Sequence, residues 1–493
     1  MRNHKSAPAG ALVFRKNGLP SALWMKSGRV VNLNLFEYTE SIKNKRIAVI
    51  GTGISNKPLI EFLASHGCDV TVCDRYAWYR ITKEAGQLES LGVKWKLGPD
   101  FLEELDFDVI FRTPSLMPFD KHLMQAKQKG SIVTSEMELF FEVCPCRVIA
   151  VTGSDGKTTT TTVISQLLKA AGYTVHLGGN IGWPLLCDTI QMKADDVAVV
   201  ELSSFQLHSM TCRPCVSVIT NISPNHLDVH KDYEDYVEAK KSIYRKQQRN
   251  DVLVLNADDV RTPEFASEAH SQIRLFCAGR KVQNGVFCKD GVIWRAKNGQ
   301  YTPVLRVDEI WLPGMHNCMN YMAAFAATQD DVPDDVCRQV AMTFKGVEHR
   351  LEMVRELRGI TFINDSIATS PTRTIEGLHS LKTKPIVIAG GSDKKIPFDA
   401  LGDELCQYAK AVFLTGDTAE LIREAIVSSP YYTAGILPVH ILDGFRETVL
   451  AASDAAEEGD IVLLSPACAS FDHFKDYAQR GRAFKSIIRN LPS

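Results

Sequence analysis

The sequence lacks two features that would assign it to a large class of proteins: a long hydrophobic run and an excess of charge of one sign. No stretch approaches the roughly 20 apolar residues of a membrane-spanning helix, and the first residues do not form the apolar core of a secretory signal. The chain has 56 Lys and Arg against 58 Asp and Glu, a formal net charge of -2. Such a balance gives no reason to expect a nucleic acid or an anionic membrane as a partner. We therefore predict a cytoplasmic protein.

The sequence also lacks the regularly paired cysteines of a disulfide-rich or zinc-binding domain. Its 13 cysteines are an odd number spread along 493 residues, which is typical of reduced thiols. Two short motifs, Cys144-Pro145-Cys146 and Cys212-Arg213-Pro214-Cys215, could indicate zinc or redox chemistry. Neither has a second pair at ligand spacing, and each precedes an apolar strand in which a small buried residue suffices. We interpret both motifs as incidental.

What the sequence does contain is an alternation of apolar strands with helical patterns. At 493 residues the chain is too long for one ordinary core, and the alternation predicts mostly parallel sheets. The predicted fold class is α/β with three domains in series: a Rossmann-like N-terminal domain, a central P-loop ATPase domain with a small antiparallel insert, and a Rossmann-like C-terminal domain. The predicted limits are residues 1–40 for an extension of uncertain order, 41–140 for the first domain, 141–346 for the central domain and 347–493 for the last.

The most informative motif is a phosphate-binding loop within residues 148–160. An apolar strand leads into a turn bracketed by Gly153 and Gly156, and a Thr-rich helix follows. Such glycines let the backbone approach phosphate oxygens, and the N–H groups of the helix N-terminus point back at the turn. Lys157 supplies a mobile positive charge, and the hydroxyl of Thr158 can ligate the magnesium that accompanies ATP. The alternative is a Gly-rich turn that binds nothing. The predicted ATP-binding residues of the loop are Gly153, Ser154, Asp155, Gly156, Lys157, Thr158, Thr159 and Thr160.

A second glycine-containing turn follows the first strand, residues 46–50. The sequence Gly51-Thr52-Gly53-Ile54-Ser55-Asn56 opens a helical pattern, and the next strand ends at Asp74. An acidic residue about 20 positions after such a turn is typical of dinucleotide-binding folds. Asn56 stands where the third glycine of that fingerprint should be, so NAD is not predicted. The N-terminus of the helix can still hold a phosphate group, and a tight turn without a ligand is the alternative.

Two further strands of the central domain end in groups that could hold a metal ion. Glu201 closes an apolar strand, which is where the magnesium of a P-loop enzyme finds a carboxylate. His226 and Asp228 emerge from a turn after another such strand. The alternatives are a glutamate that faces solvent and a histidine that is structural or on the surface.

Lys240 and Lys241 lie in a segment, residues 233–248, that the pattern predicts to be helical. From the residues alone we interpret them as part of a solvated helix face. A lysine at its usual pKa of about 10.4 is an ammonium and cannot ligate a metal. Only a chemical modification of the amine would change this interpretation.

In the last domain, strands end in polar residues: Asn364-Asp365-Ser366, Gly390-Gly391-Ser392-Asp393-Lys394 and Ser465-Pro466-Ala467-Cys468-Ala469-Ser470. The ends of parallel strands converge on one crevice. The hydroxyls, the Asp and the Lys suit a small zwitterion with one or two carboxylates, although turns favour the same residue types.

Taken in order, these motifs resemble the Mur ligases, a family of ATP-dependent enzymes that form amide bonds. The resemblance rests on the short Thr-Gly-x-x-Gly-Lys-Thr form of the phosphate loop and on motifs further along the chain. These are Gly179-Asn180-Ile181-Gly182, Glu201-Leu202-Ser203-Ser204-Phe205-Gln206-Leu207, Asn225-His226-Leu227-Asp228, His316-Asn317-Cys318-Met319-Asn320, His349-Arg350 and Asn364-Asp365-Ser366. Residues 201–207, with residues 464–472 and Gln479-Arg480-Gly481, are similar to the D-glutamate-adding branch of the family.

The resemblance implies a ligase of peptidoglycan precursor synthesis that adds D-glutamate to UDP-N-acetylmuramoyl-L-alanine through an acyl phosphate. It further implies ATP and Mg²⁺, with two metal sites, and a monomer that acts on small-molecule substrates. Two alternatives stay open. One is a sister ligase of the Mur or folylpolyglutamate type that uses another amino acid, and the other is a non-catalytic nucleotide-binding relative.

The site residues of the family are carried over to the matching positions. Catalytic roles are implied for Lys157, Glu201, His226, Lys240 and Arg350. Magnesium ligands are implied at Thr158, Glu201, His226 and, if carbon dioxide has carbamylated its amine, Lys240. Beyond the phosphate loop, ATP contacts are implied for Asn317, Arg350 and Asp365. The UDP-substrate is implied to meet Gly51, Thr52, Gly53, Ile54, Ser55, Asp74 and Asn180, and D-glutamate to meet Thr369, Lys394, Ser470 and Tyr477.

One motif departs from the family pattern. The usual Asn-Asp-Ser-Lys-Ala-Thr is Asn364-Asp365-Ser366-Ile367-Ala368-Thr369 in this chain. The resemblance places the lysine that Ile367 replaces on the D-glutamate side chain or on the phosphate, so a positive charge is missing at this point. Lys394 and Lys395 are the candidates to supply it.

Overall fold

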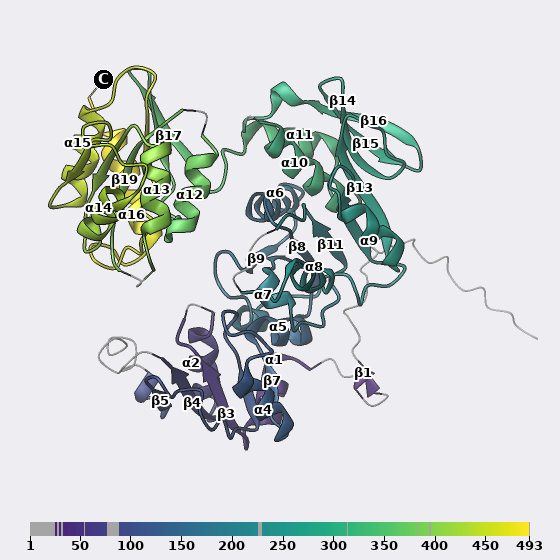
Figure 1. Ribbon diagram of the computed structural model, residues 1–493. Coiled ribbons are helices and arrows are strands. Elements are labelled where there is room, and N and C mark those ends of the chain that lie inside the picture. The colour runs from purple at the N-terminus through teal and green to yellow at the C-terminus, as the bar shows by residue number, and fades with distance from the viewer. Residues whose placement is uncertain are drawn as a thin grey trace, which may run out of the picture. The chain divides into compact units, whose positions relative to one another are not determined.

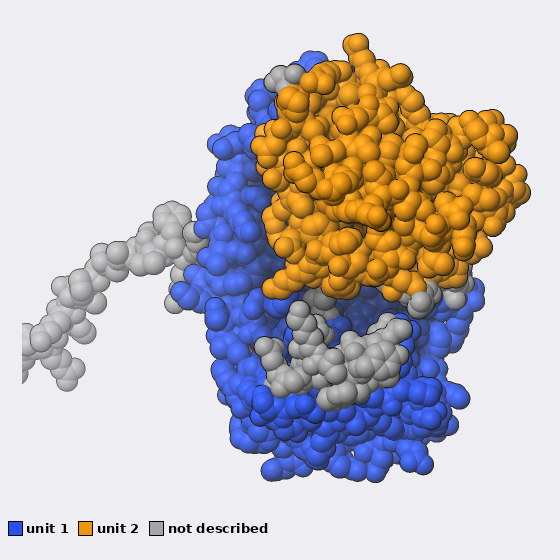
Figure 2. All heavy atoms as spheres, turned by 90° about the vertical axis from the view of Figure 1, so that its left-hand side faces the viewer, with its two compact units in different colours: residues 1–344 blue, residues 345–493 orange. Residues whose placement is uncertain are grey.

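The chain divides into two compact units, Met1–Phe344 and Lys345–Ser493, which Figure 2 shows in different colours. A computed structural model describes residues 25–26, 29–30, 33–53, 55–75, 88–224, 229–312, 314–381, 383–393 and 396–492. Four of the candidate site residues, Ile54, His226, Asp228 and Lys394, lie outside the described residues. Lys395 and most of the predicted N-terminal extension also lie outside the described residues. The described part of the extension includes two short paired strands, β1 (Met25–Lys26) and β2 (Arg29–Val30).

The first sheet of unit 1 is parallel, with the strand order β5-β4-β3-β6-β7 (Figure 1). Its strands are β3 (Arg46–Ile50), β4 (Asp69–Asp74), β5 (Lys94–Leu97), β6 (Val109–Phe111) and β7 (Ile132–Thr134). The helices around it are α1 (Leu35–Ile42), α2 (Lys57–Ser65), α4 (Lys121–Gln128) and α5 (Glu136–Val143). Counted along the chain, this order is 3-2-1-4-5, which matches the first five strands of the Rossmann order 3-2-1-4-5-6, with the order reversing beside the first strand. The predicted Rossmann-like architecture is confirmed here.

The central sheet has the order β16-β15-β14-β13-β12-β11-β8-β10-β9 (Figure 1). Its strands are β8 (Arg147–Thr152), β9 (Val175–Gly179), β10 (Val197–Glu201), β11 (Val216–Ile219), β12 (Val252–Asn256), β13 (Gln272–Ala278), β14 (Gly285–Lys289), β15 (Val292–Lys297) and β16 (Gln300–Arg306). The pairs from β9 to β14 are parallel, whereas β14, β15 and β16 pair antiparallel. The predicted antiparallel insert is therefore present, and it extends the central sheet at one edge.

The helices of the central region pack against this sheet. They are α6 (Lys157–Ala170), α7 (Ser204–Leu207), α8 (Tyr233–Lys241), α9 (Thr262–Glu268), α10 (Met315–Ala327) and α11 (Asp334–Thr343), with short 3-10 turns at η1 (Cys187–Ile190) and η2 (Val307–Glu309). Buried side chains of α6 and α10, such as Leu167 and Phe325, form one core with Val151 and Val199 of the sheet. A second core continues from the first sheet into the central sheet, for example from Val49 to Val200.

The predicted helix over residues 233–248 is wrong in its length, because α8 ends at Lys241. The N–H groups of residues 242–244 donate to carbonyls three residues back, which is the pattern of a tightening turn rather than of an α-helix. The hydroxyl of Ser217 donates to the carbonyl of Ile243 at 2.9 Å, and the Gln247 amide donates to the carbonyls of Pro214 and Val252. These contacts with β11 and β12 hold the segment in a non-helical path.

Unit 2 contains a sheet of order β17-β18-β22-β19-β20-β21 (Figure 1). Its strands are β17 (Glu352–Leu357), β18 (Ile360–Asn364), β19 (Ile386–Ala389), β20 (Ala411–Leu414), β21 (Val439–Ile441) and β22 (Ile461–Leu464). Its helices are α12 (Pro371–His379), α13 (Asp399–Tyr408), α14 (Ala419–Ser428), α15 (Phe445–Asp454) and α16 (Tyr477–Arg489). Only the pair β17–β18 is antiparallel among the described pairs. The neighbouring strands β18, β22 and β19 therefore end side by side, as the sequence predicts.

Candidate active site

The phosphate loop between β8 and α6 approaches its neighbours too closely for any residue with a side chain. Gly153 has φ +148°, and an added Cβ would lie 1.9 Å from Oγ1 of Thr220, which follows β11. Gly156 has φ +74°, and its Cβ would lie 2.2 Å from Oδ1 of Asn320 on α10. Both positions need glycine on conformational and on steric grounds. Asn317, predicted to contact ATP, lies one turn before Asn320 on α10 and so shares its helix face.

The turn after β11 holds the loop through Asn221, a residue to which the sequence assigned no role. The backbone carbonyl of Asn221 accepts from Ser154 N at 2.9 Å, and its side-chain oxygen accepts from Asp155 N at 2.9 Å. The Ser154 hydroxyl donates to the carbonyl of Ser223 and lies 2.8 Å from the Tyr236 hydroxyl. These polar groups fix the loop, which leaves its glycines and the start of α6 to face a phosphate.

Lys157 and Thr158 open helix α6 directly after the glycine turn. The Lys157 ammonium donates to the carbonyls of Gly153 at 3.0 Å and Ser154 at 2.7 Å. Thr158 is buried at the second position of the helix. A mobile cation and a hydroxyl thus stand at the N-terminus of a helix, where an anion is stabilised.

Glu201 ends β10, and the parallel register places it opposite Val151 of β8 and Gly179 of β9. Its side chain is 2% exposed. One carboxylate oxygen accepts from the Asn180 amide at 2.8 Å, and the other is buried without a hydrogen-bond partner among the described residues. Buried polar atoms are usually paired, and a carboxylate oxygen is a typical ligand of Mg²⁺. Asn180, predicted to meet the UDP-substrate, therefore lies against the predicted metal ligand.

Lys240 is buried, so the interpretation of a solvated face is wrong for this residue. It is 2% exposed, and its amine donates to the Gly153 carbonyl at 2.8 Å and approaches Thr152 Oγ1 at 3.4 Å. Burial, together with the charge of Lys157, lowers the pKa of Lys240 well below its usual value. Lys241 differs, since it forms ion pairs near the surface with Glu238 and Glu268.

A hydrogen-bonded network that the sequence did not reveal connects α7 with α8. Asp235 accepts from His208 Nε2 and from His230 Nδ1, each at 2.9 Å, and His230 Nε2 lies 3.0 Å from the Ser204 hydroxyl. Burial alone would raise the pKa of Asp235, but the hydrogen bonds from the two histidines outweigh it, so the pKa is lowered. The network ties the segment after Glu201 to the helix that carries Lys240. Its residues are far apart in the sequence, so only the fold could bring them together.

The turn after β3 is closed by Asp74. Thr52 donates to one Asp74 oxygen through both its backbone N–H and its hydroxyl, at 2.9 Å each. The side chain of Asn56, which replaces the expected glycine, is buried and donates to the carbonyl of Ile50 at 2.8 Å. A small cavity beside this turn brings a first-sheet residue, Ser55, together with Gln206 of α7. Gly51 and Gly53 belong to the same turn, so the predicted UDP-substrate residues other than Ile54 and Asn180 lie together.

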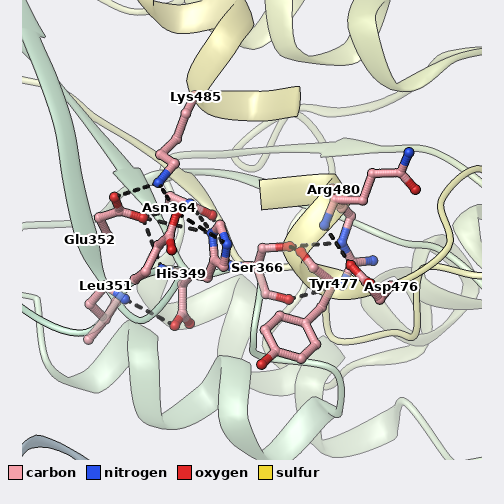
Figure 3. Close-up of polar contacts among 12 residues, drawn as sticks. His349, Leu351, Glu352, Asn364, Ser366, Asp476, Tyr477, Arg480 and Lys485 are labelled. Atoms are coloured by element: carbon pink, nitrogen blue, oxygen red, sulfur yellow. Dashed lines mark hydrogen bonds and ion pairs between the residues drawn. The ribbon is translucent and has the colours of Figure 1, made fainter. Parts of the chain in front are cut away.

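In unit 2, Asn364 and Ser366 are part of a buried polar scaffold (Figure 3). The Asn364 amide lies 2.9 Å from His349 Nδ1 and donates to Glu352 at 3.0 Å. The Ser366 hydroxyl donates to the carbonyl of Tyr477 at 2.7 Å, which ties β18 to the first residue of α16. For Asn364 and Ser366, the alternative of a structural turn agrees with these contacts.

Asp365 lies between those two scaffold residues in the sequence, but unlike them it carries an ionisable group whose pKa is shifted. Its carboxylate accepts from the Ser465 hydroxyl at 3.0 Å and from Leu351 N at 3.2 Å. Burial raises the pKa of Asp365 to about 7, against the opposing effects of these bonds and of the Arg350 and Arg373 charges. The charge of Arg350, which is predicted to act on ATP, therefore reaches Asp365.

The described residues predicted for D-glutamate are Thr369, Ser470 and Tyr477. Tyr477 is half-buried, with its ring edge-on to His349 at 6.1 Å between centroids. Ser470 is buried in the segment between β22 and α16. Thr369 N donates to the carbonyl of Ile367 at 2.8 Å, and the same carbonyl accepts from Arg373 Nη1 at 3.4 Å. The sequence did not single out Arg373.

Comparisons with known proteins match the regions of the chain that contain these two candidate sites. Residues 151–328 match the model of the Mur ligase middle domain, and residues 349–468 match that of the Mur ligase glutamate ligase domain. The chain is 46% identical to the UDP-N-acetylmuramoylalanine-D-glutamate ligase of Acetivibrio thermocellus, over 94% of this chain and 100% of that protein. It is 45% identical to the protein of the same name from Ruminiclostridium cellulolyticum, over 94% of this chain and 100% of that protein.

Among solved structures, the chain is similar in fold to UDP-N-acetylmuramate-alanine ligase MurC from Thermotoga maritima. The TM-score is 0.51 at 19% identity, over 90% of this chain and 99% of that chain. At this identity the match supports the fold alone. Within the residues that the structure describes, no helix combines the length and the apolar character needed to cross a membrane.

We predict that Gly156→Ala weakens ATP binding about 10- to 100-fold, because the new methyl group collides with Asn320 and strains a backbone at positive φ. Titration calorimetry with a non-hydrolysable ATP analogue and Mg²⁺ measures the effect. Gly172→Ala is the matched control, since Gly172 has φ +89° but an added Cβ would meet nothing within 4 Å. Equal affinity in the Gly156→Ala and Gly172→Ala proteins would contradict the steric argument.

We predict that Asp365→Asn is more stable than the wild type above about pH 7, by about 4 kcal/mol, because it relieves a pKa difference between folded and unfolded states of roughly three units at about 1.4 kcal/mol per unit. The folded-state pKa of Asp365 is raised from 3.8 to about 7. Between these values the folded protein holds a proton that the unfolded chain has lost, so the free energy of unfolding falls as pH rises through this window. The Asn side chain resembles the protonated acid and removes this loss.

Thermal unfolding at several pH values tests the effect of Asp365→Asn. The advantage of the variant should shrink as the pH falls from about 7 towards 4, where the wild-type carboxyl is protonated in both states. The exposed Asp443→Asn serves as the control and should show no such trend. An advantage that is the same at every pH would show that titration of Asp365 is not its cause.

Proposed function

The chain belongs to the Mur ligase family, and we propose that it is an ATP- and Mg²⁺-dependent ligase that joins D-glutamate to UDP-N-acetylmuramoyl-L-alanine in peptidoglycan precursor synthesis. The observation that carries this proposal is the convergence of the phosphate loop, the carboxylate of Glu201 and the amine of Lys240 at one edge of the central sheet. We further propose that it acts as a monomer in the cytoplasm, on small molecules only.

The reaction forms an amide in two steps. A carboxylate oxygen of UDP-N-acetylmuramoyl-L-alanine attacks the γ-phosphorus of ATP, ADP leaves, and an acyl phosphate results. The neutral amine of D-glutamate then attacks the acyl carbon, the C–O bond to phosphate breaks, and the proton lost by the nitrogen leaves with the phosphate as hydrogen phosphate. We assign to Lys157 and the N-terminus of α6 the binding of the phosphates and the opposition of the negative charge that develops there.

Thr158 and Glu201 are proposed to hold a magnesium ion. The buried, unpaired oxygen of Glu201 among the described residues fits that ion. Magnesium bound there would neutralise phosphate charge during transfer. The turn of Gly51, Thr52, Gly53 and Ser55, closed by Asp74, is proposed to receive the UDP moiety, and Asn180 to fix the orientation of Glu201.

We also propose that Lys240 is carbamylated. Its amine loses a proton readily because it is buried beside Lys157, and a neutral amine can add to carbon dioxide to give a carbamate and a proton. The modification would turn this buried amine into an anion that can ligate metal. It would also turn the repulsion between Lys240 and Lys157 into an attraction.

A sister ligase that uses another amino acid is the second candidate, favoured by Ile367 in place of the usual lysine. The identity of 44–46% to relatives named for D-glutamate speaks for the first candidate.

ADP release with a panel of amino acids separates the two candidates. We expect release in the presence of ATP, Mg²⁺ and UDP-N-acetylmuramoyl-L-alanine to depend on D-glutamate, because unit 2 would position only a matching amine for attack. L-glutamate, L-lysine and meso-diaminopimelate are the controls. Release that responds to L-lysine or meso-diaminopimelate but not to D-glutamate would refute the assignment.

Lys240→Ala should lower kcat about 100- to 1,000-fold, because it removes a charge that acts on the transferring phosphate. Added acetate or propionate should restore part of the rate, since a short carboxylate can occupy the space of the carbamate. Lys241→Ala is the matched control on the same helix, and its rate should neither fall comparably nor respond to the acids. Full activity of Lys240→Ala would remove this residue from the site.

A further inference from the structure

Arg373 is an exposed cation that lies beside the candidate D-glutamate residues. It belongs to the first turn of α12, which begins at Pro371, directly after the segment that carries Ile367 and Thr369. Its Nη1 lies 3.4 Å from the carbonyl oxygen of Ile367, a distance at the weak limit for a hydrogen bond. This is its one hydrogen bond within the described part of the chain. Most of its N–H donors are therefore available to another group.

The charge of Arg373 reaches two residues near the predicted D-glutamate site. It opposes the effect of burial on the pKa of both Asp365 and Tyr477. Asp365 follows β18, and Tyr477 begins α16. A guanidinium that influences both residues lies near the ends of β18 and β22, where the sequence predicts a ligand with carboxylates. Since the pKa of Asp365 is about 7, that carboxyl cancels the arginine charge only in part near neutral pH.

Two other cations of this region are occupied by the scaffold (Figure 3). Arg480 donates to the Ser366 hydroxyl and to backbone carbonyls at 3.0–3.1 Å, and it is buried. Lys485 pairs with Glu348 at 2.6 Å and with Glu352 at 2.9 Å. Arg480 cannot turn to a ligand without leaving buried acceptors unpaired, which is costly. Lys485 cannot do so without breaking both of its ion pairs.

We propose that Arg373 binds a carboxylate of the incoming amino acid and so helps to determine its identity. This inference rests on the proposed function, because it assumes that an acidic amino acid enters the crevice of unit 2. The planar fork of a guanidinium matches a carboxylate with two parallel hydrogen bonds. The contact with the carbonyl of Ile367 places the guanidinium beside the motif that lacks the lysine. The positive charge that the motif at Ile367 lacks is thus supplied from α12.

Steady-state ADP release at saturating ATP and UDP-N-acetylmuramoyl-L-alanine, with D-glutamate varied, tests the assignment. We expect Arg373→Gln to raise the KM for D-glutamate about 10- to 100-fold, with the KM for ATP unchanged. Arg373→Lys should recover part of the loss, because it keeps the charge without the fork. Arg423→Gln is the matched control, an exposed arginine of α14 that pairs with Glu420.

An unchanged KM for D-glutamate in Arg373→Gln would overturn the proposal. So would a change confined to kcat or to the KM for ATP, which would place the arginine on the phosphate instead. Equal melting temperatures of the Arg373→Gln and Arg423→Gln proteins exclude loss of folding as the cause of a raised KM. The charge-conserving Arg373→Lys keeps the test decisive if the Gln variant is less stable.

Two substrate analogues identify which carboxylate is bound. D-glutamine lacks the γ-carboxylate and D-isoglutamine lacks the α-carboxylate. If the KM of Arg373→Gln is the same for D-glutamate and D-glutamine, the contact is with the γ-carboxylate. If the KM of this variant is the same for D-glutamate and D-isoglutamine, the contact is with the α-carboxylate.

The wild-type enzyme separates failure of this inference from failure of the proposed function. If the wild type uses another amino acid and not D-glutamate, the proposed function is wrong. The comparison of Arg373→Gln with Arg423→Gln, repeated with that amino acid, then tests the arginine by itself. A raised KM supports carboxylate binding, and an unchanged KM overturns it.

Discussion

The candidate site of unit 1 depends on the close approach of the phosphate loop to the ends of its neighbouring strands and helices. Space for a Cβ is absent at Gly153 and Gly156, where Thr220 and Asn320 fill the surroundings. Asn221 binds the loop from the side through its backbone and its amide. A loop confined in this way keeps its shape without a ligand, so the N–H groups at the start of α6 need little reorganisation to bind phosphate.

The same close packing buries ionisable groups that have no ion-pair partner within the described part of the chain, and this burial favours the chemistry proposed for the site. Lys240 is buried against a carbonyl and a hydroxyl rather than a carboxylate, with Lys157 near enough to repel its charge. Glu201 is buried with one oxygen unpaired among the described residues. Isolated buried charges destabilise a fold, and such groups are concentrated at functional sites. A neutral amine at Lys240 relieves part of this penalty. Burial therefore favours the neutral form of the Lys240 amine, which is the form that can react with carbon dioxide.

The sequence predicted the parts of the fold that depend on local pattern. The strands, their parallel pairing, the glycine turns and the position of Glu201 at a strand end all follow from residue type and spacing. The helix boundary at Lys241 was missed because Ser217 and Gln247, which end the helix, act through tertiary contacts. The burial of Lys240 was missed for a related reason. The face of α8 that meets the phosphate loop is set by Tyr236 and by the network around Asp235. The local pattern of apolar and polar residues does not predict those contacts.

The candidate site of unit 2 can change one residue without losing its hydrogen-bonded frame. Asn364, Ser366 and Arg480 are buried and hydrogen-bonded, so replacing any one of them would leave partners unpaired. Ile367 is only partly buried, and it contributes its backbone to the contacts with Thr369 and Arg373. Its side chain is therefore free to vary, while its carbonyl still lies within 3.4 Å of an arginine from the next helix. The positive charge that a ligand needs can then come from α12 instead of from the strand end. The ligand requires a charge at the right place, whichever residue carries it.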